Sequence, residues 1–524
     1  MIRVLSTVLF YIVLFSFSFS IAGTGCCAAD GFVPGAVFRE YRWYGPWANA
    51  SNWQRVTDPD ATHSGAKEFL PNPVNKMIFD NLDGVVRIEV CIERLQCHAG
   101  THNKRIRLNG NEWLRIPEAS EIPGGNPECY QTLTYPVVEI PLSHVNEGLN
   151  TFELTAGNQI CNNFGWGQFI IYGVTFRFFY DDSKPHPSGE ITEPLSGSTI
   201  GENPTITVST NQPEDIASID FIGYYEDFNF KGDNIWRQWQ YSLKNGMLIH
   251  HLGTARSAPF SITWDTAWVP DQDQPMKIMA RIVDKNGMHA ITPAVENIRF
   301  VRDGRSVVLY KPSNVPTQWV SRAGVYKFCK VTVTEDLQTA LDAKMILVSW
   351  AGTYAEKIGI NNQKVGGSIG LSYDRSYDEL LVPLENIRQG DNTLFTYSLT
   401  DGHGIEVNWP GIVLKIRYSE PVRVGEIEPF FEGGHTGTVF RLLGNTPNPF
   451  NSTTAIRYEL ASREKVRLTV YDIQGKKVAL LVDTMQPKGI HTASVDGENL
   501  PTGLYFYRLR AGDGEKVGKM MLIK

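Results

Sequence analysis

The C-terminal stretch Ala455-Ile-Arg-Tyr-Glu-Leu460 alternates apolar and polar residues, and Val466-Arg-Leu-Thr-Val470 does the same. Alternation with a period of two, bounded by turn residues, predicts strands that bury one face. Turn residues follow at Pro487-Lys-Gly489 and at Leu500-Pro-Thr-Gly503. We therefore expect residues 444–524 to form a small immunoglobulin-like β-sandwich.

The same segment resembles the C-terminal sorting domain of proteins exported by the type IX secretion system. The matching pieces, in the order of that family, are Pro447-Asn-Pro-Phe-Asn451, Val470-Tyr-Asp472 with Gly475-Lys476, Leu500-Pro-Thr-Gly-Leu-Tyr505 and the terminal Lys519-Met-Met-Leu-Ile-Lys524. The resemblance implies handling by the type IX secretion machinery and a final location that is secreted or at the outer-membrane surface. An ordinary terminal sandwich without a sorting role is the alternative.

The composition of the whole chain indicates a multi-domain all-β protein. Its 524 residues include 21 Tyr, 26 Phe, 12 Trp, 47 Gly and 29 Pro, and aromatic residues and turn formers are typical of β-sandwiches. A chain of this length should divide into about three to five domains. Residues 437–524 hold 13 Lys and Arg against 8 Asp and Glu, a net +5, which leaves −12 on the remainder of a chain of net −7. An acidic body argues against a nucleic-acid partner.

The N-terminus predicts a secretory signal peptide over residues 1–29. An apolar run from Val4 to Ala22 is followed by small residues, and we expect cleavage after Ala22 or Ala29. Lipidation of Cys26 is an alternative. No later stretch of the sequence is apolar enough to span a membrane.

Four cysteines fall in the first domain of the mature chain, and an exported protein can oxidise them. They are Cys91, Cys97, Cys129 and Cys161. Two disulfides are one interpretation and buried thiols are the other, and four cysteines allow three pairings that the sequence does not choose between. Because no short Cys-x-x-Cys pair exists, we do not expect zinc.

An internal repeat organises the rest of the chain. Residues 139–152 and 381–394 share Pro-Leu followed by Gly-x-Asn at identical spacing, and each copy follows a strand that ends in Asn-Gly or Asn-Asn. Such pairs tolerate positive φ and make tight hairpins. The repeat predicts two jelly-roll-like sandwiches of the same topology, over residues 31–182 and 303–421. The equivalent positions would then be Pro141 with Pro383 and Asn150 with Asn392.

The two repeats resemble the galactose-binding-like β-sandwiches that accompany secreted carbohydrate-active proteins. Between them, residues 187–302 resemble bacterial immunoglobulin-like domains, with a closing strand that ends in Asp284-Lys-Asn-Gly287. Residues 422–443 contain Pro and paired Gly and are expected to be an extended linker before the sorting domain at 444–524.

Aromatic loops are the candidate binding sites, because a sugar presents flat C–H faces that an aromatic ring can cover. Trp409 follows His403, Glu406 and Asn408, which places a ring beside groups that can bond hydroxyls. Trp236 and Trp239 form a second candidate on one strand-like run. The alternative is that these rings lie in hydrophobic cores.

Signs of a cofactor or of catalysis are weak. The segment Asp227-Phe-Asn-Phe-Lys-Gly-Asp233 resembles part of a calcium loop but carries Lys231 where a ligand should stand. We therefore expect no cofactor, with a structural calcium ion as the alternative. His250 and His251 are more typical of polar surface or of a satisfied core group than of a metal or acid/base site. The sequence contains no hydrolase elbow, zincin motif or phosphate loop.

The sequence therefore predicts an exported, all-β protein of tandem sandwiches that binds polysaccharide without cleaving it. A structural or adhesive surface protein is the first alternative, and a carbohydrate-active enzyme is the second. Exposed rings would favour binding over a structural role. Clustered carboxylates in a deep cleft would favour catalysis.

Overall fold

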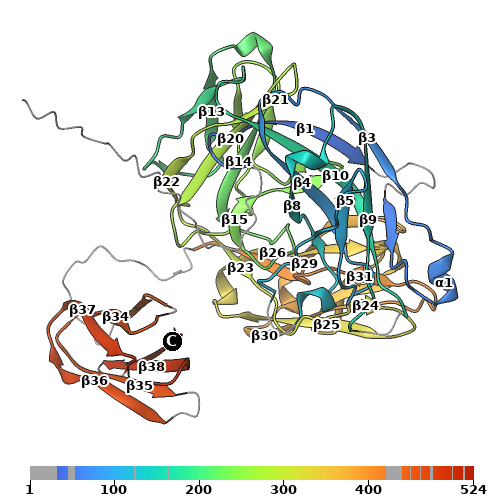
Figure 1. Ribbon diagram of the computed structural model, residues 1–524. Coiled ribbons are helices and arrows are strands. Elements are labelled where there is room, and N and C mark those ends of the chain that lie inside the picture. The colour runs from blue at the N-terminus through green and yellow to red at the C-terminus, as the bar shows by residue number, and fades with distance from the viewer. Residues whose placement is uncertain are drawn as a thin grey trace, which may run out of the picture. The chain divides into compact units, whose positions relative to one another are not determined.

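The structure is a computed structural model that describes residues 32–44, 53–122, 126–161, 165–420, 440–448, 450–460, 462–472, 476–498, 500–511 and 514–524. It confirms the all-β class and the tandem sandwiches (Figure 1). Contacts divide the chain into two compact units, Met1–Gly425, called the body below, and Glu426–Lys524. Within the described ranges, no helix has the length and apolar character needed to cross a membrane.

The first sandwich of the body packs two sheets against each other. One contains β1 (Val37–Tyr44), β10 (Gln168–Tyr180) and β4 (Val85–Leu95), joined by β2 (Gln54–Thr57), β7 (Leu133–Thr134) and β8 (Val137–Ile140). The other has the order β3 (Asn75–Phe79), β9 (Gly148–Thr155), β5 (Arg105–Leu108) and β6 (Leu114–Arg115). A short helix, α1 (Ser64–Lys67), lies in the connection between β2 and β3. Val90, Phe152 and Phe176 are almost fully buried between the sheets, because alternate residues of each strand face inward.

The second sandwich repeats this arrangement of two sheets in the same strand order. One sheet contains β23 (Ser306–Tyr310), β32 (Val413–Tyr418), β26 (Ala340–Trp350), β31 (Ile405–Val407), β24 (Val320–Ser321) and β29 (Arg375–Val382). The other has the order β25 (Tyr326–Val333), β30 (Gly390–Tyr397), β27 (Lys357–Ile360) and β28 (Gln363–Gly366). The counterpart of the long strand β10 is divided here into β31 and β32 by residues 408–412.

Two buried asparagines hold equivalent loops in the two sandwiches. Asn150 Oδ1 accepts from Asn109 Nδ2 at 2.7 Å, and Asn392 Oδ1 accepts from Asn361 Nδ2 at 2.6 Å. Each also bonds the backbone N–H and carbonyl of the residue four positions before it. This confirms the predicted equivalence of Asn150 with Asn392.

The two repeated prolines are equivalent as well. Pro141 precedes the 3-10 turn Leu142–His144, and Pro383 precedes the 3-10 turn Leu384–Asn386, with nearly the same backbone angles. The matched residues therefore lie on matching elements, as the duplication predicted.

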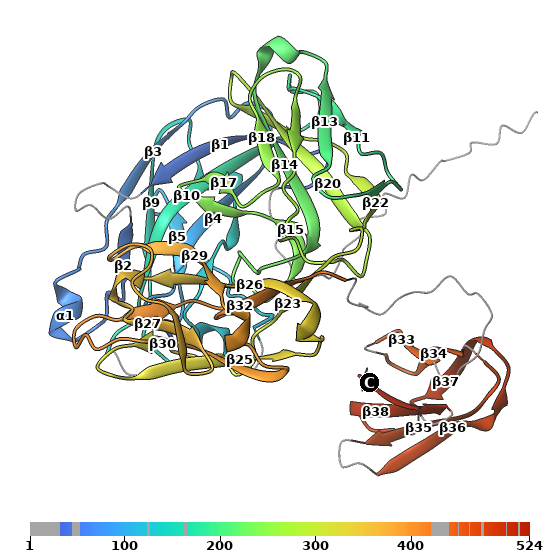
Figure 2. The ribbon, with the colours of Figure 1, turned by 180° about the vertical axis from the view of Figure 1, so that it is seen from behind.

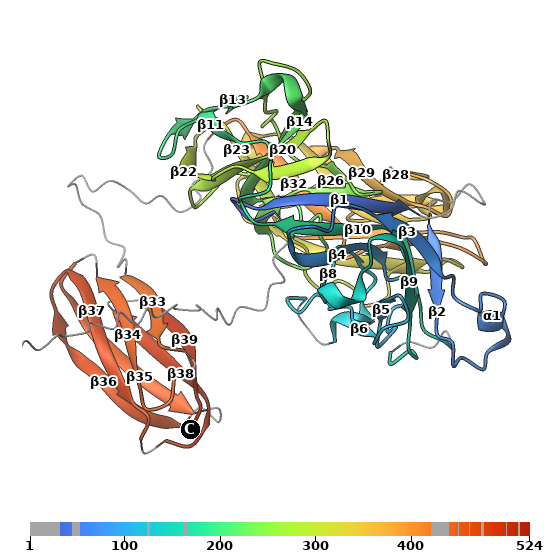
Figure 3. The ribbon, with the colours of Figure 1, turned by 45° about the horizontal axis from the view of Figure 1, so that its top comes forward.

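The middle unit is joined to the first sandwich by hydrogen bonds between strands. Its larger sheet contains β14 (Ile216–Glu226), β20 (Met276–Asp284), β21 (Met288–Ile291), β22 (Val295–Phe300), β15 (Arg237–Gln240), β18 (Gly253–Ala255) and β12 (Thr199–Ile200). The smaller elements are the sheet β11 (Gly189–Glu193), β13 (Thr205–Thr210) and β19 (Ser261–Thr263), and the hairpin β16 (Ser242–Lys244) with β17 (Met247–Ile249). β1 pairs with both β10 and β21, so one sheet of 13 strands among the described residues runs through both units (Figures 2 and 3).

All three parts of the body share a hydrophobic core where they meet. The first sandwich contributes Tyr135 and Tyr172, the middle unit contributes Phe228 and Tyr241, and the second sandwich contributes Val348, among other buried residues. The three parts are therefore not independent domains, because each part buries apolar side chains of the others. The predicted boundaries at 182–187 and 302–303 fall between strands of this continuous body.

The C-terminal unit is a separate sandwich of two sheets. The first contains β33 (Phe440–Thr446), β34 (Thr453–Leu460) and β37 (Gly489–Asp496), and the second contains β36 (Lys477–Gln486), β35 (Glu464–Asp472), β38 (Gly503–Ala511) and β39 (Gly514–Leu522). Ile456, Tyr458 and Leu460 on β34 and Val466, Leu468 and Val470 on β35 are buried. The alternation in the sequence therefore predicted both strands and their buried faces.

We expect Asn392→Ala to destabilise the body by about 1 to 3 kcal/mol, because it leaves buried backbone groups and the Asn361 amide without their partner. All 12 tryptophans precede residue 426, so tryptophan fluorescence during denaturant unfolding of the full chain reports on the body alone. The exposed neighbour Asp391→Ala is the control and should change stability by less than about 0.5 kcal/mol. Equal effects of the two variants would contradict the role given to Asn392.

Candidate functional site

Four aromatic side chains of the second sandwich meet at the surface. Trp350 ends β26, Tyr354 ends a 3-10 turn, Tyr373 precedes β29 and His403 precedes β31. The ring centroids lie 4.9 Å apart for Tyr373 and His403, 5.7 Å for Tyr354 and Tyr373, and 5.9 Å for Trp350 and Tyr373. Tyr373 is 38% exposed, and His403 is also exposed. We call these four residues the ring surface.

Contacts with the first sandwich and with β26 hold this surface in place. Trp53 of the first sandwich donates from Nε1 to the Tyr373 carbonyl at 2.8 Å, and the Ala351 N–H donates to the Asp374 carbonyl at 3.0 Å. Tyr373 and Ala351 have φ angles of 52° and 55°. Residues other than glycine and asparagine seldom adopt such angles, which persist only where the surrounding structure fixes the backbone.

Glu406 lies beside the ring surface, at the seam between the two sandwiches. It is the β31 partner of Trp350 in the sheet, so the two side chains leave the sheet on the same face. Gln131 of the first sandwich donates from Nε2 to Glu406 Oε2 at 2.7 Å. Burial raises the pKa of Glu406 to about 8, and the nearby Arg322 opposes this effect. At neutral pH this carboxyl is therefore mainly protonated and can donate a hydrogen bond.

The same loop directs its tryptophan inward. Trp409 is 7% exposed, and its ring meets Tyr130 edge-on at 5.2 Å. Its backbone N–H donates to the Gln131 carbonyl at 2.8 Å, and Asn408 is 2% exposed. Of the candidate binding residues in this loop, Trp409 and Asn408 are therefore buried, which is the core alternative for this ring, because residues 408–412 interrupt the strand and pack against the first sandwich. The exposed ring of this loop is His403.

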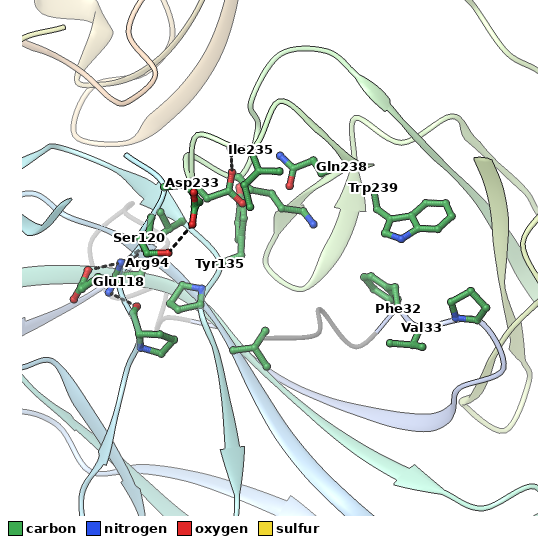
Figure 4. Close-up of a pocket in the computed structure, with 18 residues that line it drawn as sticks. Phe32, Val33, Arg94, Glu118, Ser120, Tyr135, Asp233, Ile235, Gln238 and Trp239 are labelled. Carbon is green, nitrogen blue, oxygen red and sulfur yellow. Dashed lines mark hydrogen bonds and ion pairs between the residues drawn. The ribbon is translucent and has the colours of Figure 1, made fainter. Parts of the chain in front are cut away.

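The two residues of the second candidate pair, Trp236 and Trp239, lie in different environments. Trp239 on β15 lines a cavity of about 660 Å³ between the first sandwich and the middle unit (Figure 4). Trp236 lies outside the residues that line it, and donates from Nε1 to Asn234 Oδ1 at 3.2 Å. The Lys311 ammonium lies 5.4 Å from its ring centre. The two tryptophans therefore do not form one binding surface.

Among the four cysteines of the first domain, all of which the structure describes, one disulfide is present rather than two. Cys129 and Cys161 are bonded, while Cys91 and Cys97 keep their thiols. The Cys97 thiol donates to the Gln168 carbonyl at 3.6 Å, and burial raises the pKa of this thiol to about 11. Cys91 is a core residue of β4, and Cys97, just beyond the end of that strand, packs partly buried against the same core.

In the segment that resembles a calcium loop, the carboxylates interact with other protein groups, within the loop and on the second sandwich. Asn229 donates from Nδ2 to Asp233 Oδ1 at 2.6 Å, and Asp227 forms an ion pair with Lys415. Across the part of the chain that the structure describes, no three His, Cys, Asp or Glu side chains gather as a metal would require.

The two adjacent histidines are partly buried. His250 stacks on Phe230 with ring centres 4.4 Å apart, and burial lowers its pKa to about 4. His251 Nε2 lies 2.8 Å from Thr254 Oγ1. Both therefore have structural contacts and no metal-like arrangement.

Sequence reasoning did not find Trp350, Tyr354 and Tyr373. They come from a strand end, a 3-10 turn and a loop, and no spacing in the sequence brings them together. The available signal was a tyrosine in the polar loop Leu371-Ser-Tyr-Asp374, which alone does not distinguish a binding residue from an ordinary surface residue.

Comparison with known proteins identifies the C-terminal unit. Residues 446–524 match the family described as a secretion system C-terminal sorting domain. The protein is therefore handled by the type IX secretion machinery and is secreted or located at the cell surface. The body lies outside this match, and no curated protein matches the chain.

Solved structures resemble parts of the chain distantly. A beta-porphyranase of glycoside hydrolase family 86 from the human gut bacterium Bacteroides plebeius is 12% identical, with a TM-score of 0.18, over 41% of this chain and 34% of that one. The fibronectin(III)-like modules of Clostridium thermocellum CbhA are 8% identical, with a TM-score of 0.15, over 64% and 93%. A tetra-tandem repeat of a large adhesion protein is 10% identical, with a TM-score of 0.15, over 90% and 99%. The chain thus spans about a third of the length of the porphyranase.

Removal of residues 444–524 should leave the protein in the periplasm, because the body then lacks its sorting signal. Immunoblots of cell fractions and culture medium measure this. The reciprocal fusion of residues 426–524 to a periplasmic reporter should carry the reporter out of the cell. Normal export of the truncated chain would contradict the sorting role.

Glu406→Gln should make the body more stable than the original protein at alkaline pH. The ordinary pKa of this carboxyl is 4.5 and its folded value is about 8, so between these values the unfolded state binds fewer protons and stability falls as pH rises. The glutamine variant lacks this loss, so its advantage should grow from about pH 5 to about pH 8 and then stay constant. Denaturant midpoints followed by tryptophan fluorescence measure it, with the exposed Glu356→Gln as control. A difference that does not change with pH would refute the raised pKa.

Proposed function

We propose that the exported body binds a polysaccharide at the ring surface, and that binding, not cleavage, is its role. The observation that carries this proposal is the contact among Trp350, Tyr354, Tyr373 and His403 at a partly exposed site. Sugars present flat C–H faces, and stacking a ring face on an aromatic side chain contributes about 1 to 3 kcal/mol, by analogy with stacked bases.

Polar groups for the sugar hydroxyls lie next to the rings. The His403 imidazole is part of the surface, and the Glu406 carboxyl follows three residues later on the same segment. A protonated Glu406 can donate to a hydroxyl oxygen, whereas an ionised one can only accept. Aromatic side chains with a few polar groups beside them are the usual lining of a small-molecule binding site.

The surface is held rigid before any ligand arrives. The Trp53 contact and the ladder between β26 and β31 fix the loops that carry the rings. Binding to a preorganised surface avoids the entropy cost of ordering loops and side chains. A purely structural spacer would gain nothing from partly exposed rings on strained loops, which favours binding over the structural alternative.

Tyr373→Ala should weaken polysaccharide binding by about 1 to 3 kcal/mol, because it removes the central ring of the surface. Tyr326→Ala is the matched control, since Tyr326 is 48% exposed and stacked on Tyr397, but lies on β25 of the opposite sheet. Affinity electrophoresis and calorimetry against a panel of polysaccharides measure binding, and reducing-end release from the same polymers measures cleavage.

Three outcomes would contradict the proposal. One is the absence of binding to any polymer of the panel. Another is an equal loss in the Tyr373→Ala and Tyr326→Ala proteins, which would indicate non-specific adhesion of surface aromatics. The third is release of new reducing ends, which would make the body a carbohydrate-active enzyme.

A further inference from the structure

A second group of aromatic and cationic side chains lies on the first sandwich, directly beside the ring surface. Trp53 immediately precedes β2, and Arg55 follows two positions later on that strand. Val56, the next residue, is fully buried in the core of the sandwich. Because successive side chains of a strand point to opposite faces, Trp53 and Arg55 leave the sheet on its outer face.

The guanidinium of Arg55 lies between two aromatic rings. Its central carbon is 3.7 Å from the ring centre of Phe69 and 5.6 Å from that of Trp53. Cation–π attraction holds a guanidinium in such a position. Phe69 follows α1 closely in the sequence and is 36% exposed. Among the described residues, Arg55 makes one hydrogen bond, from Nη1 to Gln168 Oε1 at 3.3 Å, so its other N–H groups are available to a ligand.

The same glutamine connects Arg55 to a further pair of rings. Gln168 Oε1 also accepts from Trp166 Nε1 at 3.3 Å, and the Trp166 ring centre lies 4.6 Å from that of the exposed His63. His63 Nδ1 accepts from the N–H of Gly65 at 3.1 Å, at the start of α1. The proton of the neutral imidazole is therefore on Nε2, which can donate to a ligand oxygen.

This group, called the first-sandwich cluster, consists of Trp53, Arg55, His63, Phe69 and Trp166. It is continuous with the ring surface, because Trp53 donates from Nε1 to the carbonyl of Tyr373 at 2.8 Å. Tyr373 is the central ring of that surface. The two groups therefore form one band of rings and polar groups that crosses the contact between the two sandwiches.

The length of this band sets the size of a ligand that can use all of it. From Tyr354 at one end to Phe69 at the other, the path of contacts passes through Tyr373, Trp53 and Arg55. One sugar ring is about as large as one aromatic side chain and covers one of them at a time. A ligand that contacts both ends must therefore be a chain of several sugar residues.

The two sandwiches are already fixed relative to each other along this band. They share a hydrophobic core, against which Trp53 and Trp350 both pack. Because no domain movement is needed to bring the two groups together, a bound chain does not have to offset the cost of ordering them. Once one end of the chain is bound, contacts at the other end are intramolecular and increase the affinity strongly.

We propose that the polysaccharide site extends from the ring surface onto the first-sandwich cluster, and that it takes a segment of several sugar residues of one polymer chain. This inference rests on the proposed function, since it assigns both groups to the same ligand. A monosaccharide or disaccharide contacts one of the two groups and binds weakly.

The test varies the length of the ligand. Oligosaccharides from the disaccharide to the octasaccharide are prepared from the polymer of the panel that binds best, and calorimetry on the mature full-length protein measures affinity and stoichiometry. Affinity should rise at least about tenfold from the disaccharide to the octasaccharide, because the longer chain reaches both groups. One octasaccharide should bind per protein molecule, whereas two independent sites would bind two.

Phe69→Ala should weaken octasaccharide binding at least about fivefold, the lower end of the loss for one stacked ring. Disaccharide binding should not change, because the short ligand stays on the rings around Tyr373. Phe328→Ala is the matched control, since Phe328 is 48% exposed on β25, in the other sheet of the second sandwich. Arg55→Met keeps an apolar stem without the donors and should also weaken the octasaccharide alone. Denaturant midpoints followed by tryptophan fluorescence verify that each variant is folded.

The outcomes separate this inference from the proposed function. Absence of binding to every polymer overturns both. Octasaccharide binding that is weakened by Tyr373→Ala but not by Phe69→Ala limits the site to the ring surface and overturns this inference alone. So does an affinity that does not rise with length, a stoichiometry of two, an equal loss for both lengths in Phe69→Ala, or the same loss in Phe328→Ala.

Discussion

The body depends on a buried carboxylate that must be neutralised from both sides of a junction. Glu40 on β1 is paired with Arg177 of the first sandwich at 3.1 Å and with Arg281 of the middle unit at 3.5 Å. Arg281 also binds Asp220 at 2.7 Å, and Arg177 binds Glu89 at 3.0 Å. Burial acts to raise the pKa of Glu40, but Arg42 and Arg281 hold it well below its usual value. Removing one partner from such a network leaves a buried charge, at a cost of about 3 to 5 kcal/mol.

This network explains why the continuous sheet forms in one register. β1 pairs with β21 at Phe38 and His289, which places Glu40 within reach of Arg281. A slip of one residue would move Glu40 to the opposite face of the sheet and leave the guanidinium groups unpaired. The pairing also covers the edge of β1, which would otherwise be open to association with other chains. The cavity relies on this fixed arrangement, since it has walls on each side of the junction.

Local patterns in the sequence predicted what depends on local physics. Alternation gave the strands at Ala455 and Val466, and the repeated Gly-x-Asn gave the loops held by Asn150 and Asn392. The burial of side chains where two parts of the body meet could not be predicted in this way. Trp409 is covered by Tyr130, a residue far away in the chain, and a tryptophan in a Gly-containing loop has the same local signature whether or not such a partner exists. The ring surface was missed for the same reason.

The disulfide lies beside the contact between the two sandwiches, and its stability depends on where the protein is located. Cys129 directly precedes Tyr130 and Gln131, the residues that cover Trp409 and bind Glu406. Its bond to Cys161 ties this segment to the loop before β10, so it restricts the conformations open to the covering segment. Such bonds persist in oxidising surroundings outside the cytoplasm. Export, which the C-terminal unit directs, therefore takes the body to conditions in which this disulfide is stable. The disulfide then helps to hold Gln131 against Glu406, next to the ring surface.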